Sequence, residues 1–146
     1  MNFNSKIHCG IKVLVDIAVY DNGSGVFQKD IAERYEMSVK FLDHIIAALK
    51  TAGLIQKQRG YKYGYKLTIE PSSITMYDVY RAFEPELGIY PCVVSTTPCP
   101  RIGICATHCF LEEFNHDVRN LLEAKTIGDL KNLQIDLKTK ASLGKN

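Results

Sequence analysis

Two short amphipathic segments within residues 28–52 are separated by only about two residues, and no other feature restricts the fold so strongly. Ser38 is placed to cap the second segment, and Gly53 is placed to end it. Helices joined by so short a turn cross at a steep angle, and the small side chain of Ala32 permits a close crossing. The pattern predicts a helix-turn-helix pair whose interior is filled by Ile31, Phe41 or Leu42, and Ile45.

The residues after this pair predict a two-stranded hairpin. Residues 54–59 suit a strand, residues 60–64 a turn, and residues 65–69 a returning strand that ends before Pro71. Elsewhere apolar residues recur at helical spacing. They predict helices at 5–20, 75–83 and 107–125, followed by a short helix that Thr126 caps. The fold class is therefore mainly α with a small β-hairpin, arranged as a winged helix-turn-helix domain and a long helix.

Length and composition fit one folded domain with appendages. The chain has 146 residues, of which 46% are hydrophobic and 23% are charged. Its apolar runs, such as residues 17–20, fall far short of the roughly 20 residues that cross a membrane, so we expect a cytoplasmic protein. We expect a winged helix-turn-helix domain at 1–84, a cysteine-bearing loop at 85–106, a long helix with a C-terminal helix at 107–137, and a flexible tail at 138–146.

Positive charge is concentrated in and after the predicted helix pair. Residues 38–66 carry six basic side chains and one acidic side chain, a net charge of +5. From residue 71 onward, eight basic and nine acidic side chains nearly cancel. Such a concentration is typical of a surface that binds a polyanion. The alternative is a solvated basic face without a partner.

The second helix and the hairpin carry side chains suited to double-stranded DNA. The first turns of a recognition helix reach base edges in the major groove, and the residues at these positions are Ser38, Lys40, Asp43 and His44. A hairpin after such a helix contacts phosphates or the minor groove, here through Arg59, Lys62 and Lys66. The alternatives are helix packing without DNA, or stacking of unpaired bases on Tyr61, Tyr63 and Tyr65.

Four of the five cysteines lie within 18 residues, in the pattern Cys92-x6-Cys99-x5-Cys105-x2-His108-Cys109. Zinc sites favour ligand pairs two to four residues apart, and the first three cysteines contain no such pair. Wider gaps suit a loop around an iron–sulphur cluster. If a helix begins near Cys105, His108 or Cys109 turns toward the same side and completes the ligand set. Zinc binding and a reversible thiol switch remain alternatives.

No motif in the chain indicates an enzyme. The sequence has no phosphate-binding glycine loop, no His-Glu-x-x-His motif and no evident Ser/His/Asp set. A different class of function also fits the charge and the thiols. In this alternative, a redox or metal-handling protein docks an acidic partner through its basic segment.

Several short motifs together resemble the Rrf-type winged-helix regulators, which include IscR, NsrR and CymR. The resemblance covers residues 1 to about 130. Besides the three spaced cysteines, it rests on Ser5-Lys6, Asp30-Ile31-Ala32-Glu33-Arg34, Ser38-x2-Phe41-Leu42, Leu49-x3-Gly53-Leu54, Arg59-Gly60 and Gly64-Tyr65-x-Leu67. It implies a homodimer that binds palindromic operators, usually as a repressor, with the long helix supplying most of the dimer contact.

The resemblance also implies a cofactor and its ligands. In cluster-binding members, three cysteines hold a 2Fe-2S or 4Fe-4S cluster that senses iron–sulphur, redox or nitric oxide status, and we favour 2Fe-2S. Carried over to this chain, the ligands are Cys92, Cys99 and Cys105, with His108 as the fourth. Cys109 and His8 of the partner subunit are the alternative fourth ligands.

The hairpin turn and one residue of the helix pair depart from the family pattern. The hairpin reads Arg59-Gly60-Tyr61-Lys62-Tyr63-Gly64-Tyr65, where the family typically has Arg-Gly-Pro-Gly-Gly-Gly-Tyr, so we expect a different fit to DNA. Glu36 occupies the turn of the helix pair, where many members have glycine. A left-handed backbone at Glu36 would cost about 1 kcal/mol.

Overall fold

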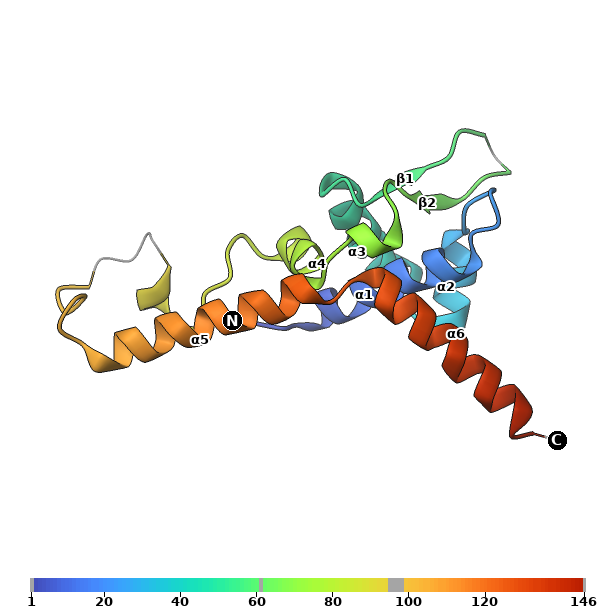
Figure 1. Ribbon diagram of the computed structural model, residues 1–146. Coiled ribbons are helices and arrows are strands. Elements are labelled where there is room, and N and C mark those ends of the chain that lie inside the picture. The colour runs from blue at the N-terminus through green and yellow to red at the C-terminus, as the bar shows by residue number, and fades with distance from the viewer. Residues whose placement is uncertain (1, 61, 95–98, 146) are drawn as a thin grey trace.

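The computed structural model describes residues 2–60, 62–94 and 99–145, and these residues form six α-helices and one antiparallel hairpin (Figure 1). The helices are α1 (Ser5–Tyr20), α2 (Gln28–Tyr35), α3 (Val39–Thr51), α4 (Met76–Phe83), α5 (Ala106–Ala124) and α6 (Ile127–Leu143). The strands are β1 (Ile55–Lys57) and β2 (Tyr65–Leu67). Short 3-10 turns lie at Pro71–Ser73 and Pro91–Val93. The predicted class, mainly α with a small hairpin, is confirmed.

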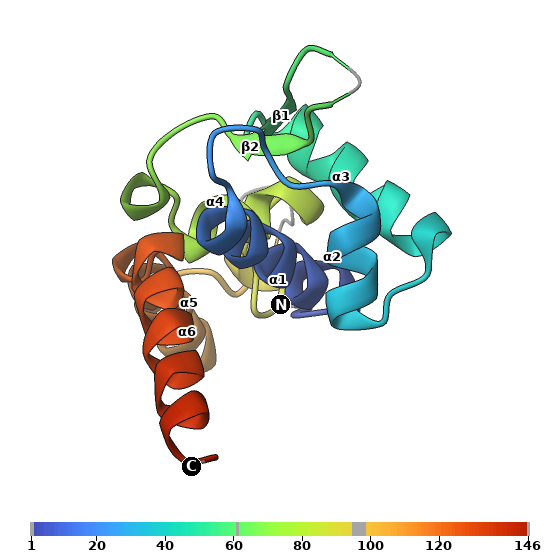
Figure 2. The ribbon, with the colours of Figure 1, turned by 90° about the vertical axis from the view of Figure 1, so that its right-hand side faces the viewer.

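Helix α1 lies at the centre of the fold and packs against α3, β2, α4 and α6. Figure 2 shows α2 and α3 on one side of α1 and α6 on the other. Asn4 caps α1 because its side chain accepts hydrogen bonds from two backbone N–H groups. The apolar side of α1 is fully buried and includes Ile7, Val13, Leu14 and Ile17. This helix therefore joins the helix pair to the C-terminal helices.

The hairpin is anchored to the segment before α2. Ile55 lies opposite Leu67 in the β1–β2 register. Val26 also exchanges two backbone hydrogen bonds with Tyr65, each 2.8 Å long, which the sequence patterns did not predict. Gly64 permits this contact, because a Cβ atom there would lie 2.3 Å from the Val26 carbonyl. The base of the hairpin is thus fixed relative to the helix pair.

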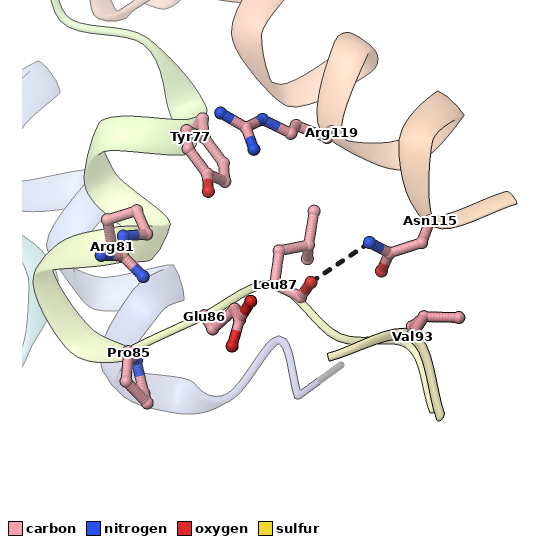
Figure 3. A pocket seen from close by; sticks show the side chains of 8 residues that line it. All are labelled: Tyr77, Arg81, Pro85, Glu86, Leu87, Val93, Asn115 and Arg119. Carbon is pink, nitrogen blue, oxygen red and sulfur yellow. Dashed lines mark hydrogen bonds between the residues drawn. The ribbon is translucent and has the colours of Figure 1, made fainter. Parts of the chain in front are cut away.

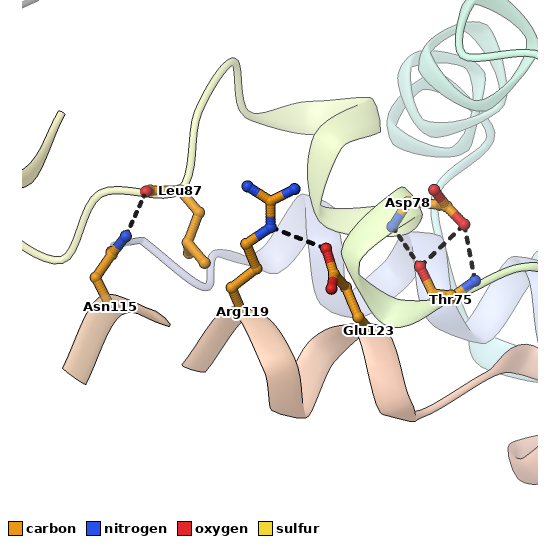
Figure 4. Close-up of polar contacts among 6 residues, drawn as sticks. All are labelled: Thr75, Asp78, Leu87, Asn115, Arg119 and Glu123. Atoms are coloured by element: carbon orange, nitrogen blue, oxygen red, sulfur yellow. Dashed lines mark hydrogen bonds and ion pairs between the residues drawn. The ribbon is translucent and has the colours of Figure 1, made fainter. Parts of the chain in front are cut away.

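Helices α4 and α6 begin at one shared junction. The Thr75 hydroxyl accepts a hydrogen bond from the Asp78 N–H, and the Asp78 carboxylate accepts one from the Thr75 N–H (Figure 4). Thr126 and Asp129 form the same capping box at the start of α6. Two backbone hydrogen bonds of 2.8 Å join these helix ends at an antiparallel bridge between Thr75 and Thr126. Helix α5 therefore leaves the body of the protein from a fixed point.

Helix α5 extends away from the rest of the fold, with the cysteine-bearing loop at its far end (Figure 1). The Asn115 side chain accepts a hydrogen bond from the Ile89 N–H and donates one to the Leu87 carbonyl, at 3.0 and 3.2 Å. These two bonds attach the loop to α5. The helix also exposes large apolar side chains, which are Phe110, Phe114 and Leu121.

The C-terminal region differs from the expected short helix and flexible tail. Helix α6 continues beyond residue 138 to Leu143. The ammonium group of Lys138 lies 4.2 Å from the centroid of the Tyr20 ring in α1. The hydroxyls of Thr139 and Ser142 donate to backbone carbonyls four residues earlier. This polar segment is therefore a solvent-exposed part of α6 that contacts α1 through Lys138.

Candidate nucleic-acid interface and cysteine site

The helix pair forms as the sequence predicts. Ile31, Leu42 and Ile45 are fully buried, and Ala32 is nearly so. The Ser38 hydroxyl accepts a hydrogen bond from the Phe41 N–H at 3.2 Å and caps α3. The turn before it contains Glu36, whose φ of 52° lies in the left-handed region. Glu36 is also the position at which many members of the family have glycine.

The side chains on the first turns of α3 are exposed. Lys40, Asp43 and His44 all lie on the surface, as does Ser38, whose hydroxyl is occupied by the cap. Asp43 has a partner that the sequence analysis missed, because the Gln28 amide donates to its carboxylate at 2.5 Å. These two residues are 15 positions apart and lie on different helices, so no local pattern pairs them. The pair adds Gln28 to the polar groups beside the candidate recognition helix.

The hairpin presents a basic groove of about 450 Å³. The groove is lined by Gln56, Lys57, Gln58, Arg59, Tyr63 and Lys66. Lys62 is also exposed, whereas Tyr61 lies outside the described residues. Tyr65 packs against the hydrophobic core and Tyr63 is 40% exposed. Of the three tyrosines considered for base stacking, Tyr65 therefore has a packing role.

The cysteines occupy the far end of α5 and the loop that precedes it. Cys92 lies in the 3-10 turn at Pro91–Val93, and Cys105 is the residue immediately before α5. Both are half-buried, as is Cys99, whereas Cys109 in the first turn of α5 is exposed. Among the described residues, no three His, Cys, Asp or Glu side chains converge to hold one metal ion. The predicted ligands share one region of the fold without forming a closed site.

His108 has an unusual environment. Its Nδ1 atom is buried and has no hydrogen-bond partner among the described residues. Its Nε2 atom lies 4.0 Å from the Glu112 carboxylate. A buried nitrogen without a partner is costly, so this atom is suited to a ligand. His8, the alternative nitrogen donor, lies exposed on α1, where it lines a groove with Leu130 and Leu133.

Comparisons with known proteins agree on one family. The sequence model of Rrf2, described as an iron-dependent transcriptional regulator, matches residues 3–132. Protein rrf2 of Nitratidesulfovibrio vulgaris is 32% identical over 89% of this chain and 87% of its own length. The HTH-type transcriptional regulator IscR of Vibrio atlanticus is 28% identical over 89% of this chain and 75% of its own length.

Solved structures show the same architecture. The structure of T. potens IscR superposes with a TM-score of 0.70 and 28% identity, covering 89% of this chain and 85% of that one. The structure of CymR from B. subtilis, described as the global cysteine regulator, has a TM-score of 0.76 and 24% identity over 91% of this chain and 98% of that one. The latter comparison supports the fold alone.

The capped helix pair and the anchored basic hairpin define a winged helix-turn-helix transcriptional regulator. The match over residues 3–132 is nearly the full length of the fold. The chain belongs to the Rrf2 family of iron-dependent transcriptional regulators. Transcription regulators of this family bind DNA, and they are not enzymes. No described helix has the length and apolarity needed to span a bilayer.

Proposed function

We propose that this protein is a homodimeric repressor of palindromic operators, and that an iron–sulphur cluster sets its affinity for DNA. The main support for a cluster comes from His108, because its Nδ1 atom is buried and has no hydrogen-bond partner among the described residues. This atom lies one helical turn from Cys105, in a region that also holds Cys92 and Cys99. Thiolates and imidazole are the donors that such clusters use.

The donor set fits the cluster by its chemistry. Cys92, Cys99, Cys105 and His108 would hold it, with 2Fe-2S favoured over 4Fe-4S. The Glu112 carboxylate lies within ion-pair distance of His108 Nε2, so it would orient the imidazole and raise its basicity as a ligand. When bound, the cluster supplies a centre whose presence and charge respond to iron supply, redox conditions or nitric oxide. Cys109 and His8 of the partner subunit remain the other candidates for the fourth position.

The loop before α5 would link this site to the DNA interface. No three donors converge among the described residues, so ligation would bring Cys92 and Cys99 closer to the start of α5. Asn115 already attaches the loop to α5 through Leu87 and Ile89. In this proposal, ligation shifts the cysteine end of α5 and so alters the separation of the two α3 helices in the dimer. A coupling of about 1 to 3 kcal/mol changes operator occupancy about 5- to 150-fold.

On DNA, α3 would lie in the major groove and the hairpin along the backbone. Lys40, Asp43 and His44 are exposed on α3 and would contact bases, with Ser38 at the helix start. Arg59 and Lys62 on the hairpin would contact phosphates. Each phosphate contact releases counterions, so affinity is expected to fall steeply as salt is raised. Binding that is independent of salt concentration would contradict this interface.

The experiment combines metal analysis with DNA binding. The protein is purified without air, its iron, sulphide and zinc are measured, and its affinity for an operator is compared before and after the cluster is removed. Cys92→Ser, Cys99→Ser and Cys105→Ser are each expected to lose the cluster and to bind DNA as the cluster-free protein does.

The matched control is Cys9→Ser on α1, which is expected to keep both the cluster and its effect on binding. His108→Ala and Cys109→Ser identify the fourth ligand. A colourless protein with one zinc per chain would overturn the cluster while leaving the DNA interface intact.

A further inference from the structure

A polar cleft of about 740 Å³ lies between α4, the loop before Cys92, and α5 (Figure 3). Its size falls within the range of small-molecule sites. Its polar lining includes Tyr77 and Arg81 from α4, Glu86 from the loop, and Arg119 from α5. Leu87, Val93 and Pro85 supply apolar surface. None of its charged side chains belongs to the DNA interface or to the predicted cysteine ligands described above.

One wall of the cleft is held in place by contacts within the protein. The Arg119 Nε–H donates to the Glu123 carboxylate at 2.8 Å (Figure 4), and its guanidinium lies 4.7 Å from the centroid of the Tyr77 ring. These contacts leave the terminal guanidinium nitrogens of Arg119 available at the cleft. Asn115 hydrogen-bonds to the backbone of the loop at Leu87, so the opposite wall is also attached to α5.

Arg81 and Glu86 carry opposite charges and line the same cleft, but they do not form an ion pair with each other. Neither Arg81 nor Glu86 takes part in an ion pair or a side-chain hydrogen bond among the described residues. A simple anion would be attracted by Arg81 and Arg119 and repelled by Glu86. A molecule with both a carboxylate and an ammonium group would satisfy both charges, because each finds a partner of opposite sign.

We propose that this cleft binds a small zwitterion of the amino-acid type. Its carboxylate accepts hydrogen bonds from Arg81 and Arg119, and its ammonium group donates to Glu86. The ligand's side chain lies against Tyr77 and the apolar surface of Val93. The proposal requires neither DNA nor a bound cluster.

The test is direct binding to the full-length protein. Each of the twenty proteinogenic amino acids is titrated in turn and followed by calorimetry and ligand-observed NMR. At least one is expected to bind saturably with a dissociation constant below 1 mM. Inorganic phosphate and succinate, which carry negative charge alone, are expected to bind at least about tenfold more weakly. If no amino acid binds, or if phosphate binds equally well, the proposal is overturned.

Paired changes in protein and ligand assign the contacts. The best amino acid is compared with its N-acetyl and methyl ester forms, which remove the ammonium and the carboxylate charge respectively. Each change is expected to weaken binding about tenfold in the unaltered protein. Glu86→Gln should stop discriminating against the N-acetyl form. Arg81→Gln should discriminate less strongly against the ester, because Arg119 still contacts the carboxylate.

Lys140→Gln and Asp136→Asn change the same charges on the exposed surface of α6 and serve as controls that keep both preferences. If Glu86→Gln and Arg81→Gln discriminate as strongly as the unaltered protein, the ligand lies elsewhere and the proposal is overturned. Circular dichroism of each variant tests whether it is folded. The Lys140→Gln and Asp136→Asn substitutions lie on the surface and are not expected to alter folding.

Discussion

The guanidinium of Arg34 donates two hydrogen bonds, of 2.8 and 2.6 Å, to the carboxylate of Asp16. Asp16 is 1% exposed and lies on α1, whereas Arg34 lies on α2. The Arg34 guanidinium also lies 4.1 Å from the centroid of the Tyr20 ring. This pair fixes the first helix of the helix-turn-helix to the central helix of the fold.

Replacing Asp16 by Asn removes the charge that compensates Arg34. We expect a loss of about 2 to 3 kcal/mol in the free energy of unfolding, below the range for fully buried pairs, because Arg34 keeps about a third of its side chain in water. Urea unfolding measures this loss. Glu33→Gln changes an exposed carboxylate on the same helix as Arg34 and should alter stability by less than about 0.5 kcal/mol. Equal effects of the two substitutions would contradict a specific role for the pair.

Glu36→Gly is expected to stabilise the protein. Glu36 has a φ of 52°, and a left-handed conformation costs a residue with a Cβ atom about 1 kcal/mol relative to glycine. The same replacement at Glu33, inside α2, is expected to destabilise by about 1 kcal/mol. Thermal unfolding of the two variants should therefore give shifts of opposite sign. A lower midpoint for Glu36→Gly would show that its side chain contributes more than the strain costs.

Gln28→Ala is expected to relax base preference at one operator position. Gln28 donates to the Asp43 carboxylate, and a carboxylate held in one orientation accepts hydrogen bonds from cytosine more selectively. We expect Gln28→Ala and Asp43→Ala to reduce discrimination at the same base pair by about 1 kcal/mol each, with no further loss in the double variant. Competition binding with operators randomised at single positions measures these preferences.

Lys29→Ala removes a charge next to Gln28 and serves as the control. It is expected to weaken binding to all operator sequences uniformly, as loss of a phosphate contact does. If Gln28→Ala behaves like this control, the hydrogen bond to Asp43 has no role in base selection.

The exposed apolar surface of α5 predicts dimerisation through this helix. Phe110 and Phe114 are 61% and 46% exposed, and their rings stack with centroids 5.9 Å apart. Replacing both by serine is expected to weaken dimerisation at least about a hundredfold, since burial of a phenylalanine contributes about 1.5 to 3 kcal/mol. Sedimentation equilibrium measures the association. Ile69→Ser, which changes an exposed apolar residue outside α5, should leave it unchanged.

Much of the fold was predictable because its helix ends are encoded locally. Ser38 and Thr126 each cap the helix that the sequence assigns to them. Apolar periodicity predicted the ends of the helices at 5–20, 75–83 and 107–125 to within one residue. Helix α6 was underestimated, because its last turns are polar and are stabilised by the contact between Lys138 and Tyr20, which are 118 positions apart.

The candidate site was predictable only in its components. The spacing of Cys92, Cys99 and Cys105 indicates cluster chemistry, but the buried Nδ1 atom of His108 depends on the packing around the first turn of α5. The bridge between Val26 and Tyr65 and the hydrogen bond from Gln28 to Asp43 join segments far apart in sequence. Such contacts arise from the tertiary fold, and no local pattern encodes them.

The shared junction of α4 and α6 makes α5 a lever arm. One end is clamped by the bridge between Thr75 and Thr126, and the other end carries Cys105. The 19 residues of α5 span about 28 Å, so a tilt of about 5° at the clamp displaces the far end by about 2.5 Å. In reverse, a displacement of about 1 Å at the cysteine end turns the clamp by only about 2°. A displacement at the cysteine end therefore turns α5 by only a small angle at the junction. A force applied at that end acts on the junction with a lever arm of about 28 Å.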